Sequence, residues 1–155
     1  MKTKRTPRPK NGLVKETFPN GNTSVTGRMR NGIRTGVWKY YLRNGTLRAS
    51  GAYRRNEMDG AWTWYRENGK KWQVGTFLAG EKHGPWKRYH LNGKLFDSGR
   101  FAHNEKSGTW KIFDPKGKLL NIIRYKKNHP PLELKARRHQ RPTRKKAAAK
   151  VKKKR

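Results

Sequence analysis

Apolar and polar positions alternate along most of the chain in segments of six to nine residues, which recur at regular intervals. A period of two is typical of β-strands, whose successive side chains point to opposite faces of a sheet. Aromatic and β-branched residues are frequent in these segments and favour strands over helices. Clusters of polar residues with glycine separate them. The pattern predicts consecutive antiparallel strands joined by turns.

The segments form a repeat of 24 residues in which one tryptophan and three glycines recur without insertion through four units. The tryptophans are Trp38, Trp62, Trp86 and Trp110, and the glycine columns are Gly27, Gly51, Gly75 and Gly99; Gly36, Gly60, Gly84 and Gly108; and Gly45, Gly69, Gly93 and Gly117. A period of this length indicates a repeat architecture, in which each unit packs on its neighbours. A degraded unit begins at Gly12 and has Val14 in the tryptophan column.

Each unit is predicted to hold two strands. The tryptophan strands are expected at residues 37–43, 61–67, 85–91 and 109–114, and the strands that cross a lone glycine at 47–55, 71–79, 95–103 and 119–127. Asn-Gly pairs such as Asn68-Gly69 predict tight hairpin turns whose two central residues both have positive φ. A longer turn is expected at the other end, for example over residues 56–60. The glutamates there, Glu57, Glu81 and Glu105, are interpreted as turn residues and not as catalytic groups.

The lone glycines predict bends, or places where a neighbouring aromatic ring lies against bare backbone. Both faces of the predicted sheet carry rings, because Trp38 and Tyr40 alternate with Lys39 and Tyr41. We therefore predict an all-β fold, a single-layer antiparallel meander of repeated β-hairpins in which rings stack between neighbouring repeats.

The charge of the chain adds what the strand pattern does not give, an indication of its partner. Lys and Arg number 41 against 9 Asp and Glu, a net charge of +32, while only 31% of the 155 residues are hydrophobic. This composition excludes a large conventional core and predicts a polyanionic partner, most commonly nucleic acid. The absence of cysteine excludes disulfides and thiolate metal sites. No apolar run is long enough for a signal peptide or a membrane span.

Three regions follow from these observations: a basic N-terminal arm (1–11), the repeat domain (12–127) and a basic C-terminal extension (128–155). The arm is expected to lie extended along phosphates; a solubilising tail and a transit peptide are the alternatives. In the extension, a short helix is predicted at residues 132–140 and a second after Thr143. A solvated tail or a nuclear-import signal is the alternative there.

The units resemble a known repeat. One unit reads G-x-Y/F-x-x-N-x-x-x-G-x-W-x-x-Y-x-x-N-G-K-L, which residues 75–77, 84–89 and 92–95 fit closely. This pattern resembles MORN (membrane occupation and recognition nexus) repeats, in the longer bacterial variant found in MORN-variant and antitoxin-type proteins. The resemblance covers about residues 12–127 and implies a β-hairpin meander. It implies little about function, because such repeats are associated with scaffolding, with acidic lipid and with unassigned roles.

The favoured hypothesis is an RNA-binding structural protein, a ribosomal or ribosome-associated component that contacts rRNA and neighbouring ribosomal proteins. Basic side chains would neutralise phosphates, and rings beside them would stack on unpaired bases. The candidate nucleic-acid-binding residues are Lys2, Lys4, Arg5, Arg8, Lys10, Lys39, Tyr41, Lys87, Tyr89, Lys111, Lys135, Arg137, Arg138, Arg141, Arg144, Lys145, Lys146, Lys150, Lys152, Lys153, Lys154 and Arg155. The expected location is a cytoplasmic ribosome or ribonucleoprotein particle, with organelle and nucleus left open.

Other functions are weighed against this one. A protein scaffold or antitoxin-like role suits the repeat surface but leaves the basic extension unexplained, and DNA binding is a close relative of RNA binding. Attachment to anionic membrane ranks lower, because no apolar face accompanies the lysines of the extension. Catalysis is not expected, since the histidines have no metal-ligand spacing and no phosphate-binding loop is present. No metal, cofactor or small-molecule substrate is predicted.

Overall fold

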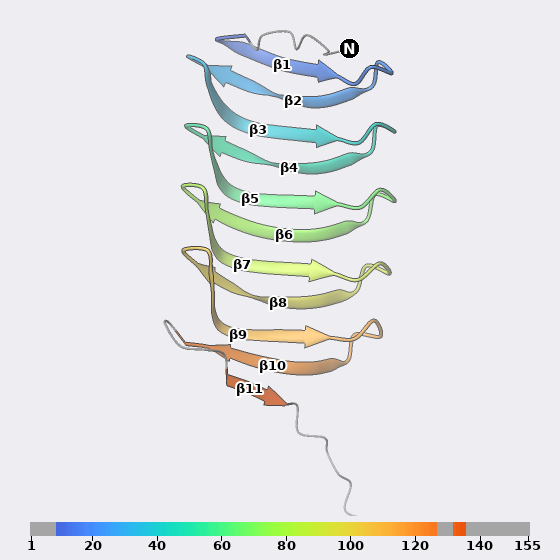
Figure 1. Cartoon of the computed structure of the whole chain (residues 1–155), viewed down its shortest axis with the longest axis vertical. Coiled ribbons are helices and arrows are strands. Elements are labelled where there is room, and N and C mark those ends of the chain that lie inside the picture. Colours follow the sequence, from blue (N-terminus) through green and yellow to red (C-terminus); the bar gives the residue numbers. More distant parts are fainter. Residues whose placement is uncertain (1–8, 127–131, 136–155) are drawn as a thin grey trace, which may run out of the picture.

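The computed structural model describes residues 9–126 and 132–135. In this part of the chain, eleven antiparallel strands form one sheet in which the spatial order is the sequence order, so that hairpins stack along the long axis (Figure 1). The strands are β1 (Gly12–Thr17), β2 (Thr23–Arg30), β3 (Ile33–Tyr41), β4 (Leu47–Arg54), β5 (Glu57–Tyr65), β6 (Lys71–Leu78), β7 (Glu81–Tyr89), β8 (Leu95–Ala102), β9 (Glu105–Phe113), β10 (Leu119–Tyr125) and β11 (Leu132–Lys135). The predicted all-β meander of hairpins is confirmed.

Each repeat is joined to the one before it by a tryptophan that lies against a glycine of the preceding strand. Trp62 is paired with Gly51 in the ladder between β4 and β5, and a methyl group on Gly51 would overlap the indole ring. The Trp62 indole N–H also donates a hydrogen bond of 3.0 Å to the carbonyl of Ala52. The same overlap is found for Gly27, Gly75 and Gly99 with Trp38, Trp86 and Trp110. The expectation that rings cover the lone glycines is confirmed.

A second ring from each repeat completes the core. The Phe77 ring stands edge-on between two indoles, at 77° to Trp62 and 71° to Trp86. Tyr53 and Phe101, 24 residues before and after Phe77, each contact two indoles in the same way, and Tyr125 contacts that of Trp110, so an unbroken line of rings runs from Trp38 to Tyr125. We call this line the aromatic spine. The buried area is therefore distributed along the array and not gathered in one central cluster.

The Asn-Gly turns differ in type from the prediction. In the first complete turn, Leu42 accepts a hydrogen bond from the Gly45 N–H at 2.9 Å and donates one to Thr46 at 2.9 Å. Only the glycine has positive φ (85°), so this is a three-residue loop that ends in a bulge. Asn44 acts through its side chain, whose carbonyl oxygen accepts from the Thr46 N–H at 3.0 Å. The predicted two-residue turn at the Asn-Gly pairs is wrong.

The two-residue turns lie at the opposite end of the hairpins. Arg55 and Asn56 both have positive φ, at 52° and 71°, and Glu57 already begins β5. The long turn predicted over residues 56–60 is therefore wrong, as is the placement of the glutamates in loops. Gly60 (φ 77°) lies inside β5 beside a shift in register, where it forms a bulge.

Contacts with the preceding repeat hold these turns in place. The Asn56 side chain accepts a hydrogen bond of 2.7 Å from the Arg34 N–H, and the Asn56 N–H donates to the Arg34 carbonyl. Asn104 makes the same two bonds to Lys82 one unit later. Positive φ is unfavourable for a residue such as Arg55, and bonds of this kind compensate for it.

The C-terminal extension also departs from the prediction. A helix was expected over residues 132–140, but Leu132–Lys135 forms strand β11, antiparallel to β10 with Leu132 opposite Arg124. The alternating sequence of this segment suits a strand, and β10 offers an unpaired edge that a local helix signal does not take into account. The rest of the predicted helix and the second helix lie outside the described residues.

Candidate nucleic-acid interface

Exposed lysines form a row across one face of the sheet. Lys15, Lys39, Lys87 and Lys111, which we call the lysine row, lie on β1, β3, β7 and β9 at equivalent positions of the ladder. The ladder connects them through Thr26, Ser50, Thr63, Val74 and Ser98. Strands lie about 4.8 Å apart, so lysines two strands apart are separated by about 10 Å. Thr63 replaces lysine on β5, which leaves one gap in the row.

The row lies on the face opposite the aromatic spine. Lys39 is exposed beside the fully buried Trp38, and Lys87 and Lys111 have the same relation to Trp86 and Trp110. Hydroxyl side chains and Val74 separate the lysines along the ladder, and none of the paired positions between them is acidic. This arrangement presents positive charge on every second strand except β5, with hydroxyl donors between.

The structure places the predicted site residues differently. Lys39, Lys87 and Lys111 lie in the lysine row, whereas Tyr41 and Tyr89 are half-buried and follow a register shift that separates them from the lysines. Lys10 is exposed before β1. Lys135 lies in β11 opposite Asn121. The remaining candidates lie outside the described residues: Lys2, Lys4, Arg5, Arg8, Arg137, Arg138, Arg141, Arg144, Lys145, Lys146, Lys150, Lys152, Lys153, Lys154 and Arg155.

A second set of cations, absent from the sequence-based prediction, lies on the spine face. The Arg34 guanidinium carbon is 4.0 Å from the centre of the Tyr53 ring. The Lys106 ammonium is 4.3 Å from the Trp110 ring, and Lys82 is 5.2 Å from the rings of both Trp86 and Phe101. Cation–π attraction explains their position. Their spacing of 24 or 48 residues was the signal that could have identified them.

The spine face also contains a groove at the second and third hairpins, with a volume of about 390 Å³. Its lining is mainly aromatic and consists of Tyr40, Arg48, Ala49, Tyr53, Met58, Trp62, Trp64, Tyr65 and Trp72. We call it the aromatic groove. Trp72 is 44% exposed, and Arg48 is exposed as well. The Tyr40 hydroxyl donates to that of Tyr53 at 3.2 Å. Burial is the largest cause, and this hydrogen bond the next, that raises the pKa of Tyr53 to about 12. Tyr53 is therefore neutral at physiological pH.

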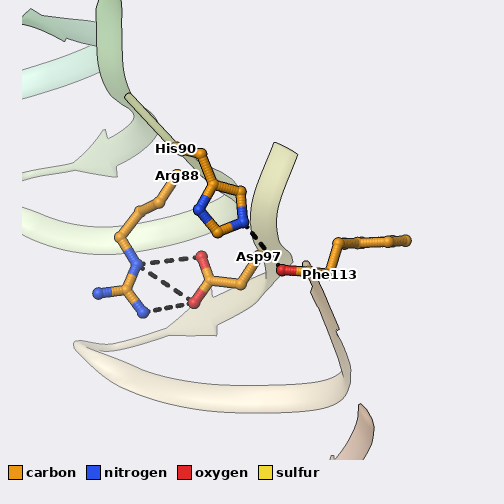
Figure 2. A network of polar contacts seen from close by, with 4 residues as sticks. All are labelled: Arg88, His90, Asp97 and Phe113. Atoms are coloured by element: carbon orange, nitrogen blue, oxygen red, sulfur yellow. Dashed lines mark hydrogen bonds and ion pairs between the residues drawn. The ribbon is translucent and has the colours of Figure 1, made fainter. Parts of the chain in front are cut away.

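One repeat further on, an ion pair takes the place of two uncharged side chains. Figure 2 shows Arg88, at the position of Trp64, facing Asp97, at the position of Gln73. Asp97 is 2% exposed and accepts hydrogen bonds from the Arg88 Nε at 3.0 and 3.2 Å and from its Nη2. These bonds raise the pKa of Arg88 above its usual value. The guanidinium carbon lies 5.1 Å from the Phe96 ring centre, so a planar cation occupies this part of the face.

The loops near this pair are joined between repeats. His90 Nε2 lies 2.9 Å from the carbonyl oxygen of Phe113 (Figure 2). The His90 ring also contacts the Phe96 ring edge-on. Arg66, one repeat earlier, donates to the Tyr89 carbonyl at 2.9 Å. These side chains each bridge to the next unit, and the bridges keep the hairpin ends in register.

The histidine and acidic side chains are dispersed over the described residues. Within residues 9–126 and 132–135, no group of three or more His, Asp or Glu side chains is placed to hold a metal ion. His103 and Glu81 form an exposed pair, with 2.7 Å between Nδ1 and Oε2. The same part of the chain contains no helix of the length and apolarity that a membrane crossing requires.

Comparison with known proteins identifies the repeat. The family described as "MORN repeat variant" matches four segments, residues 34–54, 58–79, 82–101 and 106–127. No curated protein sequence matches the chain significantly. One similar solved structure is titled "Crystal structure of GtfA/B complex bound to UDP and GlcNAc"; it is 13% identical over 66% of this chain and 22% of that chain, with a TM-score of 0.36. This chain thus spans about a fifth of that protein. Because the four matched segments cover more than half of its length, the chain belongs to the MORN repeat variant family.

Proposed function

We propose that this MORN-repeat protein is a scaffold that binds RNA, with the lysine row, on the face opposite the aromatic spine, and the basic termini in contact with phosphates. The observation that carries the proposal is the row itself: exposed lysines at equivalent ladder positions on one face. A net charge of +32 favours an anionic partner of many charges. RNA supplies phosphates at regular intervals, and their neutralisation releases counterions.

A ribosome or a similar particle is the proposed setting. Such a particle offers phosphates on several sides of a small protein, which suits a chain with cations on both faces of its sheet and at both termini. The proposed partners are rRNA and neighbouring ribosomal proteins, in the cytoplasm. The role is binding and not catalysis. A MORN scaffold that binds only protein is the competing function.

Neutralising three of the four lysines of the row is expected to weaken RNA binding and its salt dependence together. In the variant Lys39→Gln, Lys87→Gln, Lys111→Gln, three phosphate contacts are lost. The slope of log affinity against log salt should therefore become less steep by about 2 for single-stranded RNA. Affinity is measured by fluorescence anisotropy between 50 and 200 mM KCl, about the range over which such contacts change affinity most clearly.

The matched control removes the same charge elsewhere. Lys70, Lys116 and Lys118 are exposed in or next to the hairpin loops, outside the row, and their replacement by Gln is expected to change the slope less. An equal effect of the two triple variants would show that the row is not the contact surface. RNA binding without salt dependence, or no binding, would contradict the proposed function.

The ribosomal setting is tested by sedimentation of a lysate with and without nuclease. We expect the full chain to co-migrate with a ribosomal subunit until nuclease is added. A chain that lacks residues 136–155 but retains β11 should migrate near the top of the gradient, while its melting temperature is unchanged. Loss of folding and association together, or migration in a nuclease-resistant complex, would favour the protein scaffold.

A further inference from the structure

The aromatic groove is a departure from the repeat, because equivalent positions in successive units differ. The position of Trp64 is taken by Arg88 and then by Ile112, and the position of Trp72 by Phe96 and then by Leu120. In the unit of Arg88 the chain's own guanidinium lies over Phe96. In the groove, Trp64 and Trp72 leave about 390 Å³ open, a volume within the range of small-ligand sites.

The Arg88 side chain shows what kind of group this part of the face accepts. Its guanidinium is planar, lies over the ring of Phe96 and is held there by the Asp97 carboxylate. In the groove, Trp72 stands where Phe96 does and presents a larger ring that is 44% exposed. Gln73 stands in place of Asp97, so the carboxylate that would hold a cation is missing. Trp64 takes the position of Arg88 in the groove, so the surface that remains for a planar group is the exposed ring of Trp72, and no acidic side chain lines the groove to hold a cation.

The charge of the groove favours an anionic ligand. Arg48 is the ionised side chain among the residues that line it, and the Arg34 guanidinium lies nearby over Tyr53. The chain as a whole carries +32, which repels a cationic ligand and attracts an anionic one. A nucleotide combines the two required properties, since its base has a flat π-face and its phosphate is negative.

We propose that the aromatic groove binds one unpaired nucleotide of RNA, with the base stacked on the exposed ring of Trp72 and its phosphate near the guanidinium of Arg48. This inference rests on the proposed RNA binding and extends it. The lysine row contacts phosphates of any strand, single or paired. The groove, on the opposite face, requires a base that is free to leave its stack.

The test compares single-stranded and duplex RNA of equal length. The Trp72→Ala variant is expected to bind a single-stranded oligoadenylate about tenfold more weakly, because stacking on one aromatic side chain contributes about 1–3 kcal/mol. Its affinity for duplex RNA and its salt slope should stay as in the unmodified chain. Trp72→Phe should restore most of the affinity. Arg48→Gln should make the salt slope less steep by about 1 for the single strand.

The control is Leu120→Ala, which alters the equivalent, 51% exposed position of a later repeat and is expected to change neither affinity. Because Trp72 is partly exposed, the variants should fold, and a melting curve of each verifies this. If single-strand affinity is unchanged in both Trp72→Ala and Arg48→Gln, the inference is wrong and the groove is left to a protein partner. Salt-dependent RNA binding would persist in that case; its absence would instead contradict the proposed function.

Discussion

Replacing Trp86 with alanine is expected to lower the free energy of unfolding by about 3–5 kcal/mol, the usual cost of truncating a large buried aromatic side chain. Trp86 is 4% exposed and contacts Phe77 and Phe101 of the aromatic spine edge-on. Its indole N–H also bonds to the Thr76 carbonyl at 3.1 Å. Urea denaturation followed by circular dichroism measures the change. Trp72→Ala is the matched control, since the same residue type is exposed there and should lose much less stability.

Gly75 gives this prediction a second test. A methyl group at Gly75 would overlap the Trp86 ring, so Gly75→Ala should destabilise the native chain strongly, by about 1–3 kcal/mol or more. In the Trp86→Ala background the overlap is gone, and the same substitution should have little effect. The two substitutions are therefore expected to be strongly non-additive. Additive effects, or an unchanged transition in Trp86→Ala alone, would show that the indole is not packed against the glycine.

Arg88→Ala is expected to destabilise the chain by about 3–5 kcal/mol, because it leaves the carboxylate of Asp97 buried without its partner. Asp97→Ala should have a smaller effect. The Arg88 side chain is 42% exposed, so its charge can reach water when the carboxylate is removed. Thermal and urea denaturation of the two variants measures this asymmetry.

A double substitution tests whether an uncharged pair of side chains can replace the ion pair at this position. The variant Arg88→Trp, Asp97→Gln introduces the residues found one repeat earlier, Trp64 and Gln73, and is expected to be about as stable as the native chain or more so. A loss as large as that of Arg88→Ala would mean that the pair itself is required at this point of the array. Equal losses in Arg88→Ala and Asp97→Ala would contradict the assignment of the buried charge to Asp97.

The regular parts of the fold were predictable because their causes recur. A tryptophan and a glycine at constant spacing determine which strand lies beside which, and the ladder pairs Trp62 with Gly51 as the columns require. The spine rings share the same period. Each of these features is repeated four times in the sequence, so a pattern that a single copy would not reveal becomes clear.

The turns and the last strand were not predictable from local sequence. Arg55 and Ala79 have positive φ, although nothing in these residue types favours it. Hydrogen bonds to the preceding repeat, such as that from Asn56 to Arg34, stabilise the turn from a distance of 22 residues. β11 forms for a comparable reason, since the free edge of β10 is a partner that a helix prediction does not consider.

The candidate interface was predicted in part. The lysine row follows from strand alternation once the tryptophans are known to face inward, so Lys39, Lys87 and Lys111 could be chosen from the sequence. The aromatic groove could not, because it depends on substitutions that differ between units and on side chains from four strands, β3 to β6. The 24-residue repeat therefore reveals the lysine row, but it does not reveal a groove whose residues differ from unit to unit.

Because the units stack along one axis, the number of repeats determines the length of the sheet. Each unit contacts its neighbours through the backbone ladder, a tryptophan packed on a glycine, a spine ring and hydrogen bonds between the turns, and it adds two strands, or about 10 Å, to the sheet. Duplication of a 24-residue unit would lengthen the positively charged face by one step while leaving every existing contact within the other units intact. The length of polyanion that such a surface spans could thus evolve by changes in copy number, without any change in the residues that make the contacts.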